Sequence, residues 1–309
     1  MISLRQHAVS LIAVFLALTL GLFLGSGFIG DRMNALTGTD RDKIGNLQDE
    51  RDALSTRVGN DDAFIKAVSG RLTDRVLVGR TVLVITTPDA ADTDVEALKG
   101  LINDAGGTVS GQMAMTTALV RDEQAAKLRT VVDQAIPTGA QLRAEYTDSG
   151  SRLGDLLGVT LLMRQGGKPA SDGDRSTALQ ALREGGFLDF AAGSVKPADL
   201  VLVVTGGQMA ADSGAQGQFV GRFAAAMSAR GTGGALVGRA GSADGGSPIG
   251  VVRSDPSLNN AVSTVDDVDQ QIGRLTTVLA LGEESAGRTG AYGTGPGATV
   301  ITVGAVPEK

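Results

Sequence analysis

Three hydrophobic patterns follow one another along the chain. Residues 6–30 carry no formal charge, with the single histidine neutral. Residues 31–74 place apolar side chains every three to four positions among charged ones, and from residue 75 short apolar runs alternate with amphipathic stretches. The pattern predicts an α/β protein with an N-terminal transmembrane helix (residues 1–30), a coiled-coil stalk (31–74) and a body with a mainly parallel sheet (75–309).

The uncharged segment between Arg5 and Asp31 is 25 residues long. About 20 apolar residues cross a hydrocarbon core of roughly 30 Å, whereas the apolar region of a signal peptide has only ~7–15. No A-x-A cleavage site is evident, so we expect an uncleaved single-pass anchor, with a cleaved signal peptide as the alternative. Because Arg5 and the α-amino group precede the span, the positive-inside rule puts the stalk and body on the extracytoplasmic side of the cell membrane.

In the stalk, a strict four-three spacing defines a seam of twelve positions, eight of them apolar. This spacing is typical of helices that supercoil around one another. The residues that we expect to carry the interaction are Ile44, Leu47, Arg51, Leu54, Val58 and Ile65. The expected partner is a second copy of the chain, which gives a homodimer, and an envelope or division protein is the other candidate. The alternative without a partner is an amphipathic helix that lies on its own domain.

Short apolar runs in the body predict strands that are buried on both faces. These runs are residues 81–85, 200–204, 235–237, 249–252 and 299–303. Helical patterns lie between them, near residues 92–105, 121–136, 151–164, 174–185, 217–230 and 266–281. Strands that alternate with helices predict a mainly parallel sheet covered by helices. A loop rich in Gly and Ser near residues 165–173 is a candidate boundary between two lobes of the body.

Catalytic and cofactor motifs are missing from the sequence. Ligands of an open parallel sheet gather at the carboxyl ends of strands, here residues 86–89 and 205–208, but neither loop carries a phosphate-binding motif. There is no G-x-S-x-G, and His7 lies in or beside the membrane segment, which excludes a histidine-based triad within this chain. The absence of cysteine excludes thiolate metal sites. We therefore expect no enzymatic activity, no catalytic residue, and no resident cofactor or metal.

Two local patterns have a structural and a metal-binding interpretation. Residues 263–269 hold three carboxylates within four positions, and their [ST]-x-x-[DE] spacing predicts the capped start of a helix, with a cation site as the alternative. Met113 and Met115 alternate on an expected strand, so their thioethers would share one side and could act as soft ligands for Cu(I). Two thioethers without a cysteine or a nearby histidine favour core packing instead.

The charge of the chain argues against nucleic acid as a partner. It has 28 basic and 34 acidic residues, which give a net charge of −6. No block of Lys and Arg follows the spacing of a phosphate backbone, so we expect no binding to nucleic acid.

Two blocks of sequence carry a resemblance to a known family. The N-terminal block consists of residues 1–7 and 10–18, then Gly21 and residues 24–27. The C-terminal block consists of residues 263–269, Gly273-Arg274 and Tyr292-Gly293. Together they resemble the actinobacterial MctB family, or mycobacterial copper transport protein B. A histidine that is usual before the late Tyr-Gly is Ala291 here.

The resemblance implies copper efflux and resistance, with copper as the transported ion and a pore in the outer membrane of mycolic-acid bacteria. Some relatives resemble instead a single-pass component of a cell-separation complex, the SteB type, whose coiled coil promotes a peptidoglycan hydrolase. The architecture expected from the residues agrees with this second, non-enzymatic scaffold, whereas the family name agrees with copper transport. Both functions stay open at this point.

Overall fold

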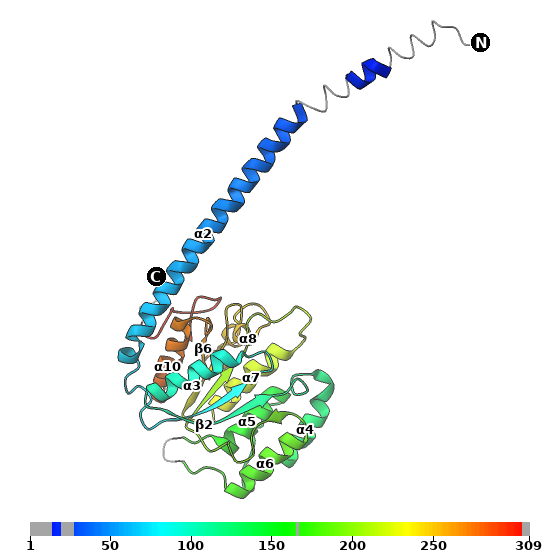
Figure 1. Cartoon of the computed structure of the whole chain (residues 1–309). Coiled ribbons are helices and arrows are strands. Elements are labelled where there is room, and N and C mark those ends of the chain that lie inside the picture. Colours follow the sequence, from blue (N-terminus) through cyan, green and yellow to red (C-terminus); the bar gives the residue numbers. More distant parts are fainter. Residues whose placement is uncertain (1–13, 20–27, 165–166, 305–309) are drawn as a thin grey trace, which may run out of the picture. The chain divides into compact units, whose positions relative to one another are not determined.

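The computed structural model describes residues 14–19, 28–164 and 167–304. The chain divides into two compact units, residues 1–61 and 62–309. Residues 14–19 are helical, and a long helix, α2 (Phe28–Leu72), begins in the first unit and ends in the second (Figure 1). The predicted anchor lies largely outside the described residues. Within the described ranges, no helix combines the length and the apolar character needed to cross a membrane.

Helix α2 is uninterrupted for 45 residues and covers nearly all of the segment predicted to be a stalk. It contains no proline, and its glycines do not break it, although each costs about 1 kcal/mol relative to alanine in a helix interior. The chain turns after the helix, where Arg75 and Gly79 have φ values of 60° and 71°. The helical prediction for this segment is confirmed, and its pairing with a second helix stays a prediction.

The body contains one seven-stranded sheet in the order β3-β2-β1-β4-β5-β6-β7. Neighbouring strands are parallel except at the edge, where β3 is antiparallel to β2. The strands are β1 (Thr81–Thr86), β2 (Thr108–Met115), β3 (Leu188–Asp189), β4 (Leu200–Val204), β5 (Gly233–Val237), β6 (Ser263–Val265) and β7 (Ala291–Tyr292). The predicted α/β class with a mainly parallel sheet is therefore confirmed.

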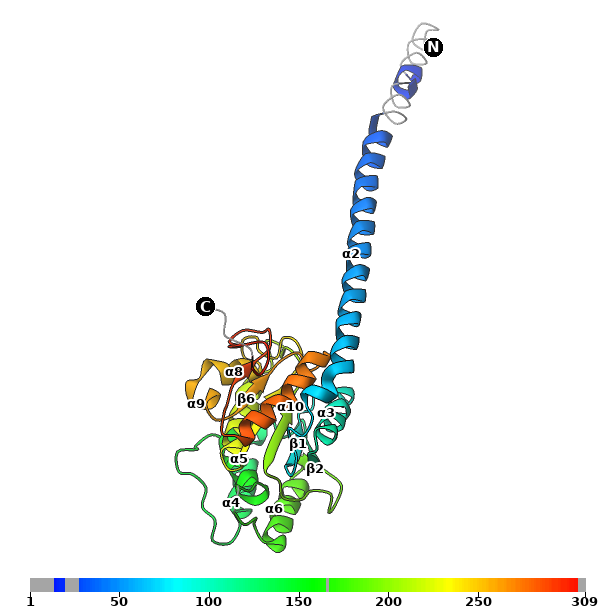
Figure 2. The same ribbon diagram turned by 90° about the vertical axis from the view of Figure 1, so that its left-hand side faces the viewer.

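Helices cover both faces of this sheet, so successive residues of a central strand enter different cores. In β1, Ile85 belongs to one core and Val84 to the other. The first core is completed by α4 (Ala125–Gln134), α5 (Ser149–Leu161), α6 (Asp172–Glu184), α7 (Gln216–Ser228) and α8 (Pro248–Ser254). The second core is completed by α3 (Asp92–Asp104) and α10 (Gln271–Ser285), which pack against each other (Figure 2). Burial on both faces explains the continuous apolar runs of the central strands.

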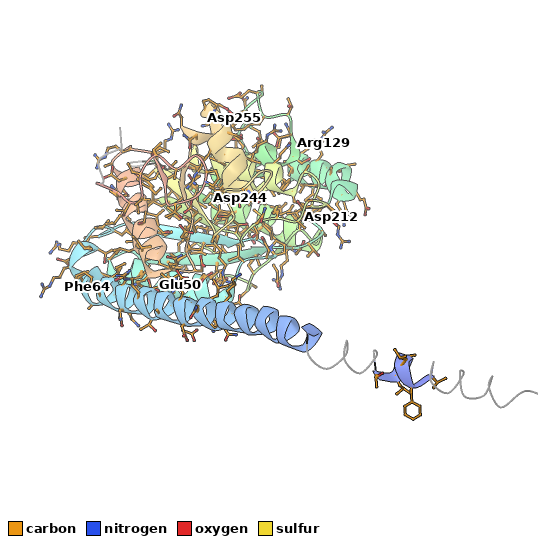
Figure 3. The ribbon with its side chains drawn as sticks, turned by 90° about the horizontal axis from the view of Figure 1, so that it is seen from above. Glu50, Phe64, Arg129, Asp212, Asp244 and Asp255 are labelled. Atoms are coloured by element: carbon orange, nitrogen blue, oxygen red, sulfur yellow. The ribbon has the colours of Figure 1, made fainter. Side chains whose placement is uncertain are left out.

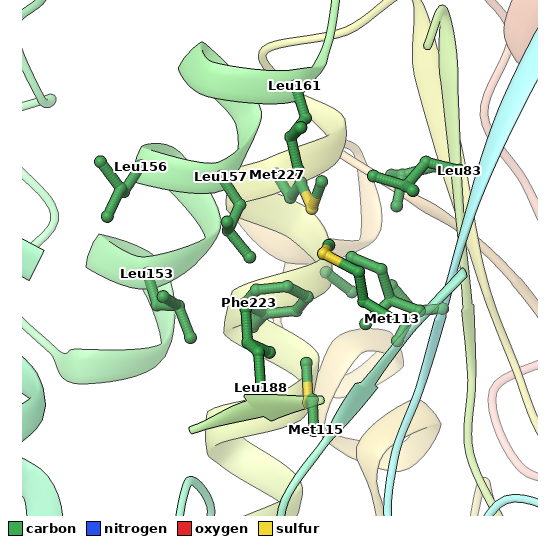
Figure 4. Close-up of a cluster of buried hydrophobic side chains, with 14 of the residues drawn as sticks. Leu83, Met113, Met115, Leu153, Leu156, Leu157, Leu161, Leu188, Phe223 and Met227 are labelled. Atoms are coloured by element: carbon green, nitrogen blue, oxygen red, sulfur yellow. The ribbon is translucent and has the colours of Figure 1, made fainter. Parts of the chain in front are cut away.

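Close contact between α5 and α7 requires glycine. Gly150, Gly154 and Gly158 recur every fourth residue on α5 and form one stripe that faces α7. A Cβ on Gly150 would lie 2.5 Å from the carbonyl oxygen of Phe219, and a Cβ on Gly154 would collide with the carbonyl oxygen of Phe223. The absence of side chains lets the two backbones approach, and the helices bring Leu153, Leu157 and Phe223 into the same cluster (Figure 4).

Two of the predicted strands are wrong. Residues 249–252 lie in α8, where Pro248 occupies the first turn and its fixed φ suits a helix start; Ile249 and Val252 are both buried on one helical face. Residues 299–303 form no regular strand, and Val300 makes only an isolated bridge to Tyr292. The helical patterns from residue 92 to residue 230 are confirmed as α3 to α7. The 3₁₀ turn Asp122–Gln124 and the short helix α9 (Pro256–Asn259) complete the described elements.

From the glycine stripe we predict that alanine changes the stability of the body in opposite directions at two helical glycines. Gly154→Ala should destabilise the body by about 1–3 kcal/mol, because the new methyl group must push α5 and α7 apart. Gly100→Ala is the matched control: Gly100 lies in α3, and a Cβ added there would meet no atom within 4 Å, so the substitution should stabilise by up to ~1 kcal/mol. Urea unfolding of the two variants measures both changes. Equal effects at both positions would contradict the packing.

Candidate functional site

An exposed apolar stripe on α2 is the candidate interaction surface. It consists of Ile44, Leu47, Arg51, Leu54 and Val58, and we call it the exposed seam. The four aliphatic side chains are 55%, 64%, 53% and 51% exposed in chain order. A 3.5-residue repeat of apolar side chains is the pattern through which helices pair in coiled coils. The structure thus places five of the six predicted interaction residues on one open face.

Arg51 is the polar member of the exposed seam. Its Nη2 lies 2.6 Å from Oδ1 of the adjacent Asp52, and both side chains are largely in solvent. An exposed ion pair of this kind contributes only about 0–1 kcal/mol, so Arg51 can turn towards another carboxylate at little cost. Glu50 precedes it on the helix and is also exposed (Figure 3).

Ile65, the sixth predicted residue, differs from the others because it is half-buried within the second unit. Ser69 and Thr73 nearby are buried, and Asp62 Oδ1 accepts a hydrogen bond from the backbone N–H of Gln271 at 3.4 Å. The last turns of α2 are therefore part of the body. The exposed seam ends before them.

The acidic run at residues 263–269 does not cap a helix, which corrects the prediction made from its spacing. Ser263 begins the buried strand β6, and α10 starts only at Gln271, with an N-cap that makes no side-chain bond. Asp266 is fully buried and pairs with Arg253, with 2.7 Å between Oδ2 and Nη1. It also accepts from the backbone N–H groups of Thr294 and Gly295 at 2.8 and 3.0 Å.

Arg253 connects this carboxylate to the segment after β7. Its side chain is only 2% exposed, and its nitrogens donate to Thr264 Oγ1 (3.0 Å), to the carbonyl of Tyr292 (2.7 Å) and to the carbonyl of Pro296 (3.1 Å). Gly293 lies between them with a φ of 126°, and a Cβ there would collide with the Asp266 carboxylate. The glycine of this Tyr-Gly pair is therefore required by backbone conformation and by space.

Asp267 lies beside this ion pair in a left-handed conformation, with φ 63°. Its carboxylate accepts a hydrogen bond from Thr294 Oγ1. Burial, together with the neighbouring Asp266, raises the pKa of Asp267 to about 6. For Asp266, burial acts in the opposite sense to the hydrogen bonds from Asp267 and Arg253, which hold its pKa below the ordinary value. Across the described residues, no three His, Cys, Asp or Glu side chains gather as a metal site would need.

A second buried carboxylate lies at the other end of β6, where the strand starts. Glu284 on α10 is 4% exposed, and its Oε1 accepts from the backbone N–H of Ser263 (3.0 Å) and from Ser263 Oγ (2.6 Å). Burial raises the pKa of Glu284 to about 7. Neither Glu284 nor Arg253 carries a local sequence signal, because their partners come from other elements.

The loops after β1 and β4 meet where the strand order of the sheet reverses. The chain leaves β1 towards β2 on one side and β4 towards β5 on the other, and a crevice forms at such a switch point. Asp89 fastens the loops together: it accepts from Thr87 Oγ1 at 2.5 Å and from the N–H of Gly206 at 3.2 Å. A cavity of about 460 Å³ adjoins them, with Arg121 and Asp212 in its wall.

Met113 and Met115 share one face of β2, as their alternation predicts. Both are buried, at 0% and 2% exposed, among the leucines of the first core. Figure 4 shows their thioethers inside this cluster, with Met227 of α7. Their sulfurs fill the core and do not face solvent.

The comparison with known proteins places the chain in a family. Residues 1–303 match the family described as "Copper transport outer membrane protein, MctB", and the chain belongs to it. Proteins named "Copper transporter MctB" from Mycobacterium tuberculosis and Mycobacterium bovis are 44% identical to it over 314 residues, which cover 98% of this chain and 99% of theirs. The protein of the same name from Mycobacterium leprae is 44% identical over 325 residues.

Glu284 predicts how stability depends on pH. Its folded pKa of about 7 lies above the ordinary value of 4.5, so its contribution is fully present below pH 4.5 and is lost as pH rises through 7. The difference in the pKa corresponds to roughly 3 kcal/mol of unfolding free energy. Glu284→Gln should remove this loss. Its stability relative to the unmodified chain should therefore rise between pH 4.5 and pH 7.5.

Chemical unfolding across this pH range measures the effect. Glu123→Gln is the control, because Glu123 is exposed and its replacement should leave the pH profile unchanged. If the unfolding free energies of Glu284→Gln and of the unmodified chain change in parallel with pH, the predicted titration of Glu284 is wrong.

Proposed function

We propose that this chain is a cell-envelope protein that takes part in copper transport or copper resistance. The observation that carries the proposal is family membership along the whole chain, together with relatives named copper transporters at 44% identity over 98% of its residues. Copper is the cargo in this proposal and not a resident cofactor. The family description also supports placement in the outer membrane, whereas the cell membrane follows from the positive-inside rule.

The proposed arrangement has three parts: an anchor in residues 1–30, a stalk in residues 31–74 and an extracytoplasmic body in residues 75–309. The uncharged residues 6–30 support a single membrane-spanning segment with the N-terminus in the cytoplasm. The continuous helix α2 and the two cores of the body support the other two parts. The chain acts by binding and has no enzymatic activity in this proposal.

The stalk is proposed to pair two copies of the chain. Each aliphatic side chain of the exposed seam contributes ~1.5–3 kcal/mol when it is fully buried, and a second copy offers the same 3.5-residue repeat. In a parallel pair, Arg51 of one copy comes beside Glu50 of the other, so the cation of the seam meets a carboxylate. The glycines of α2 make the single helix weak, and pairing would offset that weakness.

A second candidate function is a non-enzymatic scaffold whose coiled coil regulates a peptidoglycan hydrolase during cell separation. The exposed seam favours it, because an apolar stripe on a long helix is a surface for another helix. The enclosed thioethers of Met113 and Met115 favour it too, since they are not presented to a passing metal ion. In this case an envelope or division protein takes the place of the second copy.

A double substitution in the exposed seam tests the stalk. Leu47→Asp/Leu54→Asp removes two apolar contacts one heptad apart and puts carboxylates where they would be buried, so self-association should be lost. The body has its own cores and should melt at an unchanged temperature. Asn46→Asp/Ala53→Asp is the matched control, since it adds the same charge with the same spacing on the outward face. Sedimentation of the detergent-solubilised chain measures its self-association. If the control also lost association, the proposal that the exposed seam mediates self-association would be wrong.

The copper proposal is tested in a strain that lacks the protein. We expect its cellular copper to rise, and the unmodified chain and the Asn46→Asp/Ala53→Asp control to restore it. Cell separation is scored in the same cultures. Raised copper with normal separation supports the transport function, and defective separation with unchanged copper supports the scaffold. If Leu47→Asp/Leu54→Asp restores both, the stalk is a spacer and the function lies elsewhere in the chain.

A further inference from the structure

A groove at the edge of the body shares no residue with the exposed seam or with the crevice at the switch point. It runs between α6 and the segment of residues 190–196 that follows the edge strand β3, and its volume is about 720 Å³. This volume is within the range of small-molecule sites, about 300–1,000 Å³. Its floor is apolar: Leu179 and Val195 are 6% and 7% exposed, and Phe190 is half-buried beside them.

Charged side chains line the walls above this floor. Some of them have a polar partner and others have none among the described side chains. Arg175 Nη2 lies 2.6 Å from Asp172 Oδ1, and the carboxylate of Glu184 accepts from the side-chain amide of Gln180 at 2.7 Å. Arg183 and Lys196 also line the groove, and both are exposed. Among the described side chains, neither of these two cations has a carboxylate within 4.0 Å.

Arg183 is held at the mouth of the groove by an aromatic ring. The centre of its guanidinium lies 5.5 Å from the ring centroid of Phe190, which is within the distance of a cation–π contact. No described residue accepts a hydrogen bond from this guanidinium, and guanidinium groups bind carboxylates in a bidentate manner. An apolar floor with two available cations at its margin is complementary to an apolar chain with one anionic end.

We propose that the groove between α6 and residues 190–196 binds a single-chain amphiphilic carboxylate of the fatty-acid class. The hydrocarbon chain lies on Leu179, Val195 and Phe190, and the carboxylate is bound by Arg183 and Lys196.

The shape of the groove favours a single chain over a membrane surface. Docking on a bilayer needs large apolar side chains that protrude from the protein. In the described residues of the second unit, the large apolar side chains that are exposed in this way are Phe64, Leu72, Val78 and Ile301, and none of them lines the groove. The apolar atoms of the floor are recessed instead, where a chain that enters the groove can reach them.

Calorimetric titration with laurate, kept below its critical micelle concentration, tests the proposal. The titration uses residues 62–309 without detergent, because this unit contains both cores. We expect saturable one-to-one binding. Arg183→Gln/Lys196→Gln should weaken it at least about tenfold, since each charge-assisted hydrogen bond contributes ~1.5–3 kcal/mol. Arg129→Gln/Lys66→Gln removes two exposed cations outside the groove and should leave binding unchanged.

Three further probes distinguish the proposal from other occupants. Acetate has the head group without the chain and should not bind, and dodecyltrimethylammonium has the chain with the opposite charge and should bind at least about tenfold more weakly. Vesicles that contain phosphatidylglycerol should not capture the body. Equal binding of the two surfactants, no saturable laurate binding, or an effect of the control variant as large as that of Arg183→Gln/Lys196→Gln would overturn the proposal. Capture by vesicles without binding of monomeric laurate would overturn it as well.

Discussion

The ion pair between Arg253 and Asp266 is the interaction on which the carboxyl-terminal side of the body depends. Both side chains are almost fully buried. Desolvation of two charges is offset only when every donor and acceptor finds a partner, and removal of one member of such a pair costs about 3–5 kcal/mol. Here the partners come from α8, from β6 and the residue after it, and from β7 and the segment after it, so the pair joins three parts of the chain. The residues of the C-terminal block therefore have a structural role: they hold these parts of the body together.

Features that arise from local patterns were predictable from the sequence, and features that depend on distant partners were not. The strands β1, β4 and β5 were recognisable because burial on both faces leaves continuous apolar runs. Residues 249–252 carry a similar apolar run, but Pro248 and the burial of Ile249 with Val252 make it a helix. The spacing of Ser263 and Asp266 fits a helix cap, but Ser263 donates to Glu284 and Asp266 pairs with Arg253 instead. Burial of Glu284 and the groove beside α6 depend on tertiary contacts alone.

The body and the exposed seam differ in how far their apolar side chains are buried. The body buries its apolar side chains in two cores, on the two faces of one sheet. The seam has no such cover, and Ile44, Leu47, Leu54 and Val58 are all more than half exposed. Helices rely on packing of their apolar face for most of their stability, so the open stripe is the part of α2 that a partner would stabilise. This contrast makes the exposed seam the surface that the proposed pairing would use.

Cysteine scanning across residues 43–60 tests this claim most directly, because the chain contains no cysteine and each substitution is the only thiol present. Oxidation of the full chain in the cell envelope then forms a disulfide only where two copies bring the same position together. Pairing through the exposed seam predicts cross-linked dimers at residues 44, 47, 51, 54 and 58, with a 3.5-residue period and minima on the outward face. Uniformly low cross-linking would contradict pairing of two copies. A maximum on the outward face would contradict the exposed seam.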